Sequence, residues 1–99
     1  MIFNKTKVID YAKGMRIKCD RDYDRSVPQW KGLFLWHNYS VITPGISGGY
    51  RKVTGKAVFD TASDACMFLR IAAVQEFHGS SRGTVSDEDP NFPRLSEDA

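Results

Sequence analysis

The fold is decided at Gly55-Lys56-Ala57-Val58-Phe59-Asp60-Thr61-Ala62-Ser63-Asp64-Ala65, where a strand pattern passes directly into a helix pattern. Thr61 is suited to cap the helix, because its hydroxyl can accept a hydrogen bond from a backbone N–H of the first turn. Asp64 completes a Thr-x-x-Asp capping box near the positive end of the helix dipole. No proline or glycine interrupts residues 62–78, and Gly79 is suited to end the helix.

The predicted helix carries apolar side chains on two sides. At roughly 100° per residue, the arc that would pack on a sheet holds Ala65, Cys66, Phe68, Leu69, Ala72 and Ala73. Met67, Ile71 and Val74 fall on the opposite arc. Two interpretations follow: the N-terminal segment covers these three residues, or they form a homodimer contact with another copy.

Upstream of the helix, strand patterns with basic outer faces prevail. Met15, Ile17 and Cys19 alternate with Arg16 and Lys18, which is the period of a half-buried strand. Residues 50–59 form the last predicted strand, and one of its faces carries Tyr50, Lys52, Thr54 and Lys56. A hairpin loop is expected at 44–49, because Pro44 ends a strand and glycines follow.

Residues 33–42 make the most β-like run, and they are apolar on both faces. Leu33, Leu35, Tyr39 and Val41 lie on one side, with Phe34, Trp36 and Ile42 on the other. Such a strand is either covered twice or shows aromatic side chains to a partner.

Residues 20–26 are predicted to form a charged loop, and residues 27–32 a turn. The loop begins Asp-x-Asp-x-Asp like a calcium loop. However, Arg25 stands where that loop needs glycine and Lys31 where it needs glutamate, so we exclude calcium binding.

The two ends of the chain differ in charge. Residues 1–79 carry twelve Lys and Arg against seven Asp and Glu, whereas residues 80–99 carry two against five. Residues 1–14 fit a short helix slightly better than a strand, and residues 80–99 have the composition of a flexible, disordered acidic tail. The prediction is therefore one α+β domain over 1–79, with a small antiparallel sheet of about three strands packed against one C-terminal helix.

Composition limits the compartment and the chemistry. Mean hydropathy is −0.40 and no long uncharged apolar run occurs, so we expect no transmembrane helix and no membrane partner. The first five residues lack a signal-peptide pattern, which favours the cytoplasm. Cys19 and Cys66 are too few and too far apart for a disulfide scaffold and are expected to be free thiols.

No pattern of catalytic or metal-ligating residues occurs. His37 and His78 are the two histidines, and neither belongs to a His-x-x-x-His or Cys-x-x-Cys arrangement. No Gly-x-Ser-x-Gly motif occurs, and neither cysteine is paired with a histidine in a recognisable nucleophile pattern. We therefore expect a non-enzyme without a cofactor or a metal.

A basic and aromatic surface remains as the candidate binding site. Its members are Arg16, Lys18, Trp30, Lys31, Trp36, Arg51, Lys52 and Lys56. Cations supply affinity for phosphates, and aromatic rings can stack on bases or anchor a protein. The alternative interpretation is that the cations solubilise an exposed sheet face while the tryptophans belong to the core.

The stretch Phe59-Asp60-Thr61-Ala62-Ser63-Asp64-Ala65, continued by Ala72-Ala73 and His78-Gly79, resembles the last strand and helix of AP2-type DNA-binding domains. That family folds as a three-stranded antiparallel sheet against one helix, and it grips the DNA major groove with Arg and Trp from the sheet. The resemblance implies duplex-DNA binding, with Arg51 and Lys52 as positional stand-ins for the family's contacts. The family's opening motif and its Trp-Gly-x-Trp pattern are absent here.

In size and organisation the chain is also similar to small bacteriophage accessory proteins, among them anti-CRISPR inhibitors. Our first hypothesis is accordingly a non-enzymatic binding protein of phage or mobile-element type. It would dock its basic and aromatic sheet face on a host protein or nucleoprotein complex and regulate or inhibit it. The second hypothesis is an AP2-like module that binds duplex DNA with its sheet.

Overall fold

The computed structural model describes residues 7–20, 25–44, 50–54 and 56–96; for residues 50–54 it describes the backbone alone. This part of the chain forms seven strands and one helix. The elements are β1 (Lys7–Ala12), β2 (Met15–Cys19), β3 (Ser26–Lys31), β4 (Trp36–Asn38), β5 (Ser40–Pro44), β6 (Tyr50–Thr54), α1 (Ala62–Phe77) and β7 (Thr84–Ser86).

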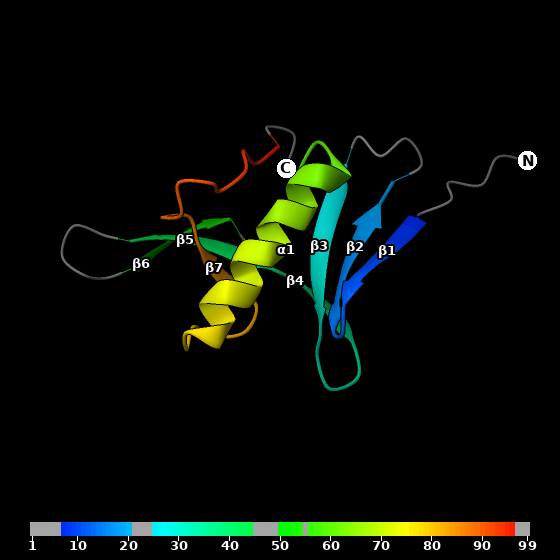
Figure 1. Cartoon of the computed structure of the whole chain (residues 1–99), viewed down its shortest axis with the longest axis horizontal. Coiled ribbons are helices and arrows are strands. Elements are labelled where there is room, and N and C mark those ends of the chain that lie inside the picture. Colours follow the sequence, from blue (N-terminus) through cyan, green and yellow to red (C-terminus); the bar gives the residue numbers. More distant parts are fainter. Residues whose placement is uncertain (1–6, 21–24, 45–49, 55, 97–99) are drawn as a thin grey trace, which may run out of the picture.

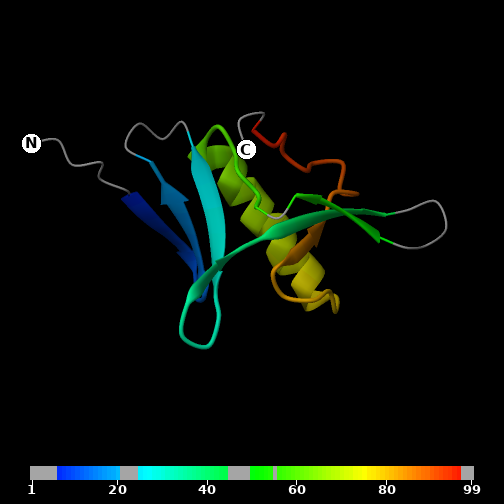
Figure 2. The same ribbon diagram turned by 180° about the vertical axis from the view of Figure 1, so that it is seen from behind.

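The strands form two sheets that share the helix. Sheet A is antiparallel, with the order β1-β2-β3-β4, and sheet B has the order β6-β5-β7, in which β7 runs parallel to β5. Helix α1 lies across sheet A on one side and reaches β7 of sheet B (Figure 1). Seen from behind, the other face of sheet A has no helix over it among the described residues (Figure 2). The architecture is the small α+β fold that the sequence predicts, with more strands than expected.

Alternation along β2 decides which face of sheet A is buried. Met15, Ile17 and Cys19 are buried toward α1, whereas Arg16 and Lys18 point the other way. The predicted strand with a basic outer face is confirmed at these positions.

Phe68 of α1 lies at the centre of the core, between rings from three other segments. Its ring centroid is 5.1 Å from Phe59, 5.4 Å from Tyr39 and 5.7 Å from Phe92. The contacts with Tyr39 and Phe92 are edge-to-face, an arrangement favoured by the ring quadrupoles. This one side chain therefore packs against the end of sheet A, the segment before the helix and the C-terminal segment.

The predicted ends of the helix are confirmed. The Thr61 hydroxyl accepts a hydrogen bond from the Asp64 backbone N–H at 3.1 Å. The helix ends at Phe77, and Gly79 follows with a φ of 101°, a value that suits glycine. The buried face contains Ala65, Phe68, Leu69, Ile71 and Ala72.

The three residues of the opposite face of α1 differ in exposure. Ile71 is buried at 5% exposure, so it is covered within this chain rather than offered to another copy. Met67 and Val74 are exposed, at 37% and 52%, and for them a contact with another copy stays a prediction. Ala73, expected on the buried arc, is exposed.

Two segments before residue 32 differ from the prediction. The described part of residues 1–14 contains strand β1 instead of a helix. Residues 27–32 were expected as a turn, but residues 27–31 belong to strand β3. Pro28 pairs with Ile17 of β2, and the opposite edge of β3 has no ladder partner at this position among the described residues. A proline is tolerated there because its missing N–H leaves no ladder bond unmade on that edge.

The long β-like run is interrupted at its start. Residues 33–35 form a turn instead of strand, closed by a 2.8 Å hydrogen bond from Gly32 N–H to the Leu35 carbonyl. Strands begin only at Trp36, and a break at Tyr39 lets the chain leave sheet A and enter sheet B. The hairpin predicted after Pro44 is consistent with the antiparallel pairing of β5 and β6, although its loop, 45–49, lies outside the described residues.

Residues 80–96 pack against the domain, so the prediction of a flexible tail is wrong for this part. Strand β7 pairs with β5, and its Val85 is 1% exposed. The Gln75 side chain donates to the Ser86 carbonyl at 2.9 Å and accepts from the Ser86 N–H at 2.8 Å. Further on, Ser96 N–H donates to the Val58 carbonyl. The few apolar residues of this segment pack against the domain and order it, although most of its residues are polar. Residues 97–99 lie outside the described part.

We expect Gln75→Ala to lower the free energy of unfolding by about 1–3 kcal/mol, because both backbone groups of Ser86 lose their partner in a half-buried place. Urea unfolding followed by circular dichroism measures the change. Arg70→Ala, at an exposed position on the same helix, is the control and should stay within about 0.5 kcal/mol of the wild type. Equal stability of Gln75→Ala and wild type would show that the two hydrogen bonds between Gln75 and Ser86 do not stabilise the fold.

Tyr39 gives the fold an alkaline limit. Burial raises the pKa of its phenol to about 12 from an ordinary 10.0, and Glu76 adds to the increase while Arg82 opposes it. The unfolded chain releases this proton near pH 10, but the folded chain holds it until about pH 12. Stability is therefore complete below pH 10 and falls as the pH rises from 10 to 12. Between pH 10 and pH 12, the melting temperature of Tyr39→Phe should therefore fall less with rising pH than that of the wild type.

Candidate functional site

The open face of sheet A gathers polar and cationic side chains from three adjacent strands. The register pairs Arg16 with Gln29, Gln29 with Asn38, and Lys31 with Trp36, so all five residues lie on the same face. This face is opposite to the one that carries Ile17 and packs against α1.

Arg16 is held in place from two directions. Its Nε donates to Gln29 Oε1 at 2.9 Å, and its guanidinium lies 4.2 Å from the centroid of the Trp36 ring. Lys31 Nζ lies 5.4 Å from the same centroid. Gln29 Nε2 in turn donates to Asn38 Oδ1 at 3.0 Å. An indole ring attracts cations through its quadrupole, so Trp36 serves here as a platform for two positive charges.

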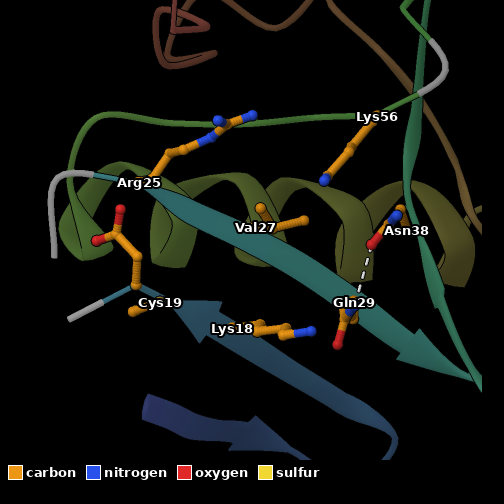
Figure 3. A pocket seen from close by; sticks show the side chains of 8 residues that line it. Lys18, Cys19, Arg25, Val27, Gln29, Asn38 and Lys56 are labelled. Atoms are coloured by element: carbon orange, nitrogen blue, oxygen red, sulfur yellow. Dashed lines mark hydrogen bonds between the residues drawn. The ribbon is translucent and has the colours of Figure 1, made fainter. Parts of the chain in front are cut away.

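A pocket of about 200 Å³ opens beside this chain of hydrogen bonds. It is lined by Lys18, Cys19, Asp20, Arg25, Val27, Gln29, Asn38 and Lys56. In Figure 3 Lys18 and Lys56 lie on opposite sides of β3: the amino group of Lys56 extends toward the strand near Val27, and that of Lys18 extends toward Gln29, which is hydrogen-bonded to Asn38. Among the described residues that line the pocket, three cations accompany one carboxylate, that of Asp20, so this lining carries a net positive charge.

The pocket exists because β3 changes partner along its length. Its C-terminal half pairs with β4 through Gln29, and its first residue, Ser26, bridges instead to Phe59. The Ser26 and Phe59 backbones exchange two hydrogen bonds, at 2.8 and 2.9 Å. Between these two pairings, the described residues leave the edge of β3 open at Val27 and Pro28. The pocket lies alongside this gap, bounded by Asn38 and by Lys56.

Such a pocket is chemically suited to an oxyanion. Ammonium and guanidinium groups make charge-assisted hydrogen bonds to phosphate or carboxylate oxygens, and the Gln29 and Asn38 amides can add polar contacts. Within the ranges that the structure describes, no group of three or more His, Cys, Asp or Glu side chains is placed to hold a metal ion. Cys19 and Cys66 are both free, and burial raises the pKa of the Cys66 thiol.

The structure brings together five of the eight residues predicted as the binding surface. Arg16, Lys18, Lys31, Trp36 and Lys56 lie on or beside the open face of sheet A. The other three, Trp30, Arg51 and Lys52, do not share this position.

Trp30 points to the opposite face of sheet A. Its ring stacks on His37 with a centroid distance of 4.6 Å and packs against the core. Gly83, with a φ of 88°, lies so close that an added Cβ would be 2.5 Å from Trp30 Nε1. The Arg82 guanidinium is 5.4 Å from the ring centroid. Trp30 therefore anchors the segment that follows the helix, and the interpretation of this tryptophan as core is the better one.

Arg51 and Lys52 belong to β6 in sheet B, on a strand that does not pair with sheet A. Their side chains lie outside the described part of the chain. The basic surface expected to extend over all strands is thus divided between two sheets.

Sequence reasoning missed Arg25, Gln29 and Asn38, which complete the site. The signal for Gln29 was present: in residues 26–31 Val27, Gln29 and Lys31 alternate with Ser26, Pro28 and Trp30. The prediction of a turn at residues 27–32 overlooked this period of two.

The sequence matches no protein-family model, and comparisons with curated proteins and with solved structures find no match. Over the described residues, no helix combines the length and the apolar character needed to cross a membrane.

The two tryptophans should respond differently to truncation. Trp30→Ala removes a ring packed against the core and should cost about 2 kcal/mol or more of unfolding free energy. Trp36→Ala removes an outward ring and its cation contacts, so the cost should be less than about 1 kcal/mol. Denaturant unfolding of both variants makes the comparison. Equal losses would contradict the assignment of the rings to opposite faces.

Proposed function

We propose that the protein is a non-enzymatic binding protein that docks the open face of sheet A on the nucleic acid of a host nucleoprotein complex and so regulates or inhibits that complex. The observation that carries the proposal is the pocket that Lys18, Arg25 and Lys56 line together with the hydrogen-bonded amides of Gln29 and Asn38. A nucleic acid presents such oxyanions, its phosphodiester groups, at regular spacing along its backbone.

The charge balance of the face supports a polyanionic partner. Arg16, Lys18, Arg25, Lys31 and Lys56 lie on it or at its edge, and among the described residues the carboxylates that accompany them are Asp10, paired across from Arg16 in β1, and Asp20. Over this described part of the face, the excess of three positive charges is modest. Affinity from such an excess falls steeply with salt, which suits a reversible contact.

The orientation of Arg16 favours contact with the backbone of a nucleic acid over the reading of its bases. Its guanidinium already covers one face of the Trp36 ring and is fixed by Gln29. A guanidinium ordered before binding loses less side-chain entropy when it meets a phosphate. The same contact removes one face of the indole from stacking with bases.

A protein of the phage or mobile-element type would use such a face to compete for a nucleic acid that a host complex must hold. Phosphate recognition without base reading permits the blocking of many sequences with one surface. The inhibitory role rests on the size of the chain, its organisation and this face.

The AP2-like alternative has one observation in its favour. An antiparallel sheet covered by one helix, with cations on its open face, is the arrangement with which that family grips duplex DNA. This alternative requires a larger contact surface than the first proposal. Arg51 and Lys52 lie in sheet B, so a bound duplex would have to reach that sheet as well as sheet A.

Fluorescence anisotropy with a labelled single-stranded oligonucleotide and its duplex, titrated with salt, tests the proposal. We expect binding to the single strand at low salt. In Lys18→Glu/Lys56→Glu the slope of log affinity against log salt should fall by about 0.7 for each phosphate that the protein no longer neutralises. Arg70→Glu/Lys13→Glu carries the same change in net charge at two exposed positions that do not line the pocket, and it serves as the control.

Three results would separate the possibilities. Loss of binding in the pocket variant alone supports the proposal. Tighter binding of duplex than of single strand, abolished by Arg51→Glu/Lys52→Glu and not by the pocket variant, supports the AP2-like alternative. No binding of either nucleic acid at low salt would end both.

A further inference from the structure

The turn between β3 and β4 presents three consecutive large apolar side chains to solvent. Leu33 is 85% exposed, Phe34 83% and Leu35 68%. The hydrogen bond from Gly32 N–H to the Leu35 carbonyl closes the turn. These residues form the tip of the β3–β4 hairpin, which extends past the body of the molecule (Figures 1 and 2). Large apolar residues gathered at one projecting site indicate a contact surface.

A second exposed aromatic residue lies toward the same end of the molecule. Phe77 is the last residue of α1 and is 87% exposed. In both views the C-terminal end of α1 and the β3–β4 tip point in the same direction. We call Leu33, Phe34, Leu35 and Phe77 together the apolar end.

Cations surround the apolar end. Lys31 precedes the turn, and its backbone N–H donates to the Gly14 carbonyl, so the β1–β2 turn with Lys13 lies beside it. Arg82 reaches the same turn, because an added Cβ on Gly14 would lie 2.7 Å from Arg82 Nη2. The carboxylate of Glu76 is 3.9 Å from Arg82 Nε and offsets part of that charge. Positive charge therefore prevails around the exposed apolar side chains.

We propose that the apolar end inserts into the interfacial region of an anionic lipid bilayer. Apolar side chains at a projecting tip gain free energy on leaving water, and Lys13, Lys31 and Arg82 would remain at the level of the lipid phosphates. Trp36, next to the tip in β4, belongs to a residue type enriched at this depth of a membrane.

The shape of the apolar end favours a bilayer over a protein groove. Its apolar residues come from two separate segments, a hairpin tip and a helix end, and the exposed His78 follows Phe77 directly. A fluid headgroup layer can accommodate separate projecting side chains. A protein partner would need two pockets at matching positions.

The expectation from the sequence that no membrane partner exists rested on the lack of a spanning segment. A surface contact requires only a few inserted side chains and nearby cations, so this expectation does not apply to it. The apolar end lies beyond the pocket of Lys18 and Lys56 but shares Lys31 and Trp36 with the open face of sheet A. Substitutions confined to Leu33 and Phe34 therefore test membrane binding without changing the cations proposed to bind nucleic acid.

Co-sedimentation with vesicles tests the inference. We expect the full chain to bind vesicles of equal parts phosphatidylcholine and phosphatidylserine, and to bind phosphatidylcholine vesicles much more weakly. Leu33→Asp/Phe34→Asp should reduce binding to the mixed vesicles by about tenfold or more, the loss expected when a large apolar side chain stays in water. Brominated lipids should quench tryptophan emission in the wild type, since Trp36 lies near the inserted tip.

Val8→Asp/Met67→Asp is the matched control, because it makes the same change at two exposed apolar positions that do not belong to the apolar end. This variant should keep the binding of the wild type, and circular dichroism melting verifies that both variants fold. Binding that is unchanged in Leu33→Asp/Phe34→Asp, or that occurs without quenching, would overturn the inference. So would concentration-dependent self-association that is lost in this variant while vesicles are not bound.

Discussion

The packing of Phe68 is the interaction on which the rest of the structure depends. Its ring contacts Tyr39 where the chain leaves sheet A, Phe59 before the helix, and Phe92 near the C-terminus. In a chain of this length a single core must be built from every suitable segment, because a small domain buries a small fraction of its surface. The C-terminal segment is therefore part of the fold, even though its composition is polar. Removing any of these rings would weaken the packing between α1 and the segment that the ring contacts.

This packing also determines which side of sheet A is free. Helix α1 can cover one face only, and the register places Trp30 on that face and Trp36 on the other. The two tryptophans have opposite roles for a simple reason. Their strands face each other with Trp30 across from His37 and Trp36 across from Lys31, so the rings fall on opposite sides. Trp30 then holds the segment around Gly83, whereas Trp36 orders Arg16 and Lys31 at the surface.

Local signals predicted well what local physics controls. The Thr61 cap, the stop at Gly79 and the alternation of 15–19 all depend on neighbours within a few residues, and they are confirmed. Failures occurred where distant contacts decide. Pro28 is accommodated only because β3 has a free edge there, and Ile71 is buried by the surrounding fold despite its position on the helical wheel. The cations of the candidate site were visible in the sequence, but its amides were not. Gln29 and Asn38 come together only because β3 and β4 pair in a register that places them opposite each other.

The site and the fold share one cause, which is the crossing of the chain from sheet A to sheet B. Strand β4 ends at Asn38, and Tyr39 turns inward to contact Phe68. The segment that returns before the helix replaces β4 beside β3, with Ala57 N–H bonded to the Tyr39 carbonyl and Phe59 bridged to Ser26. The opening between these two partners of β3 is the pocket. Its walls are therefore fixed by buried aromatic packing rather than by the charged side chains that line it. Changing Lys18 or Lys56 should alter what the pocket attracts while leaving its shape intact, which is the condition that makes charge reversal an interpretable test of binding.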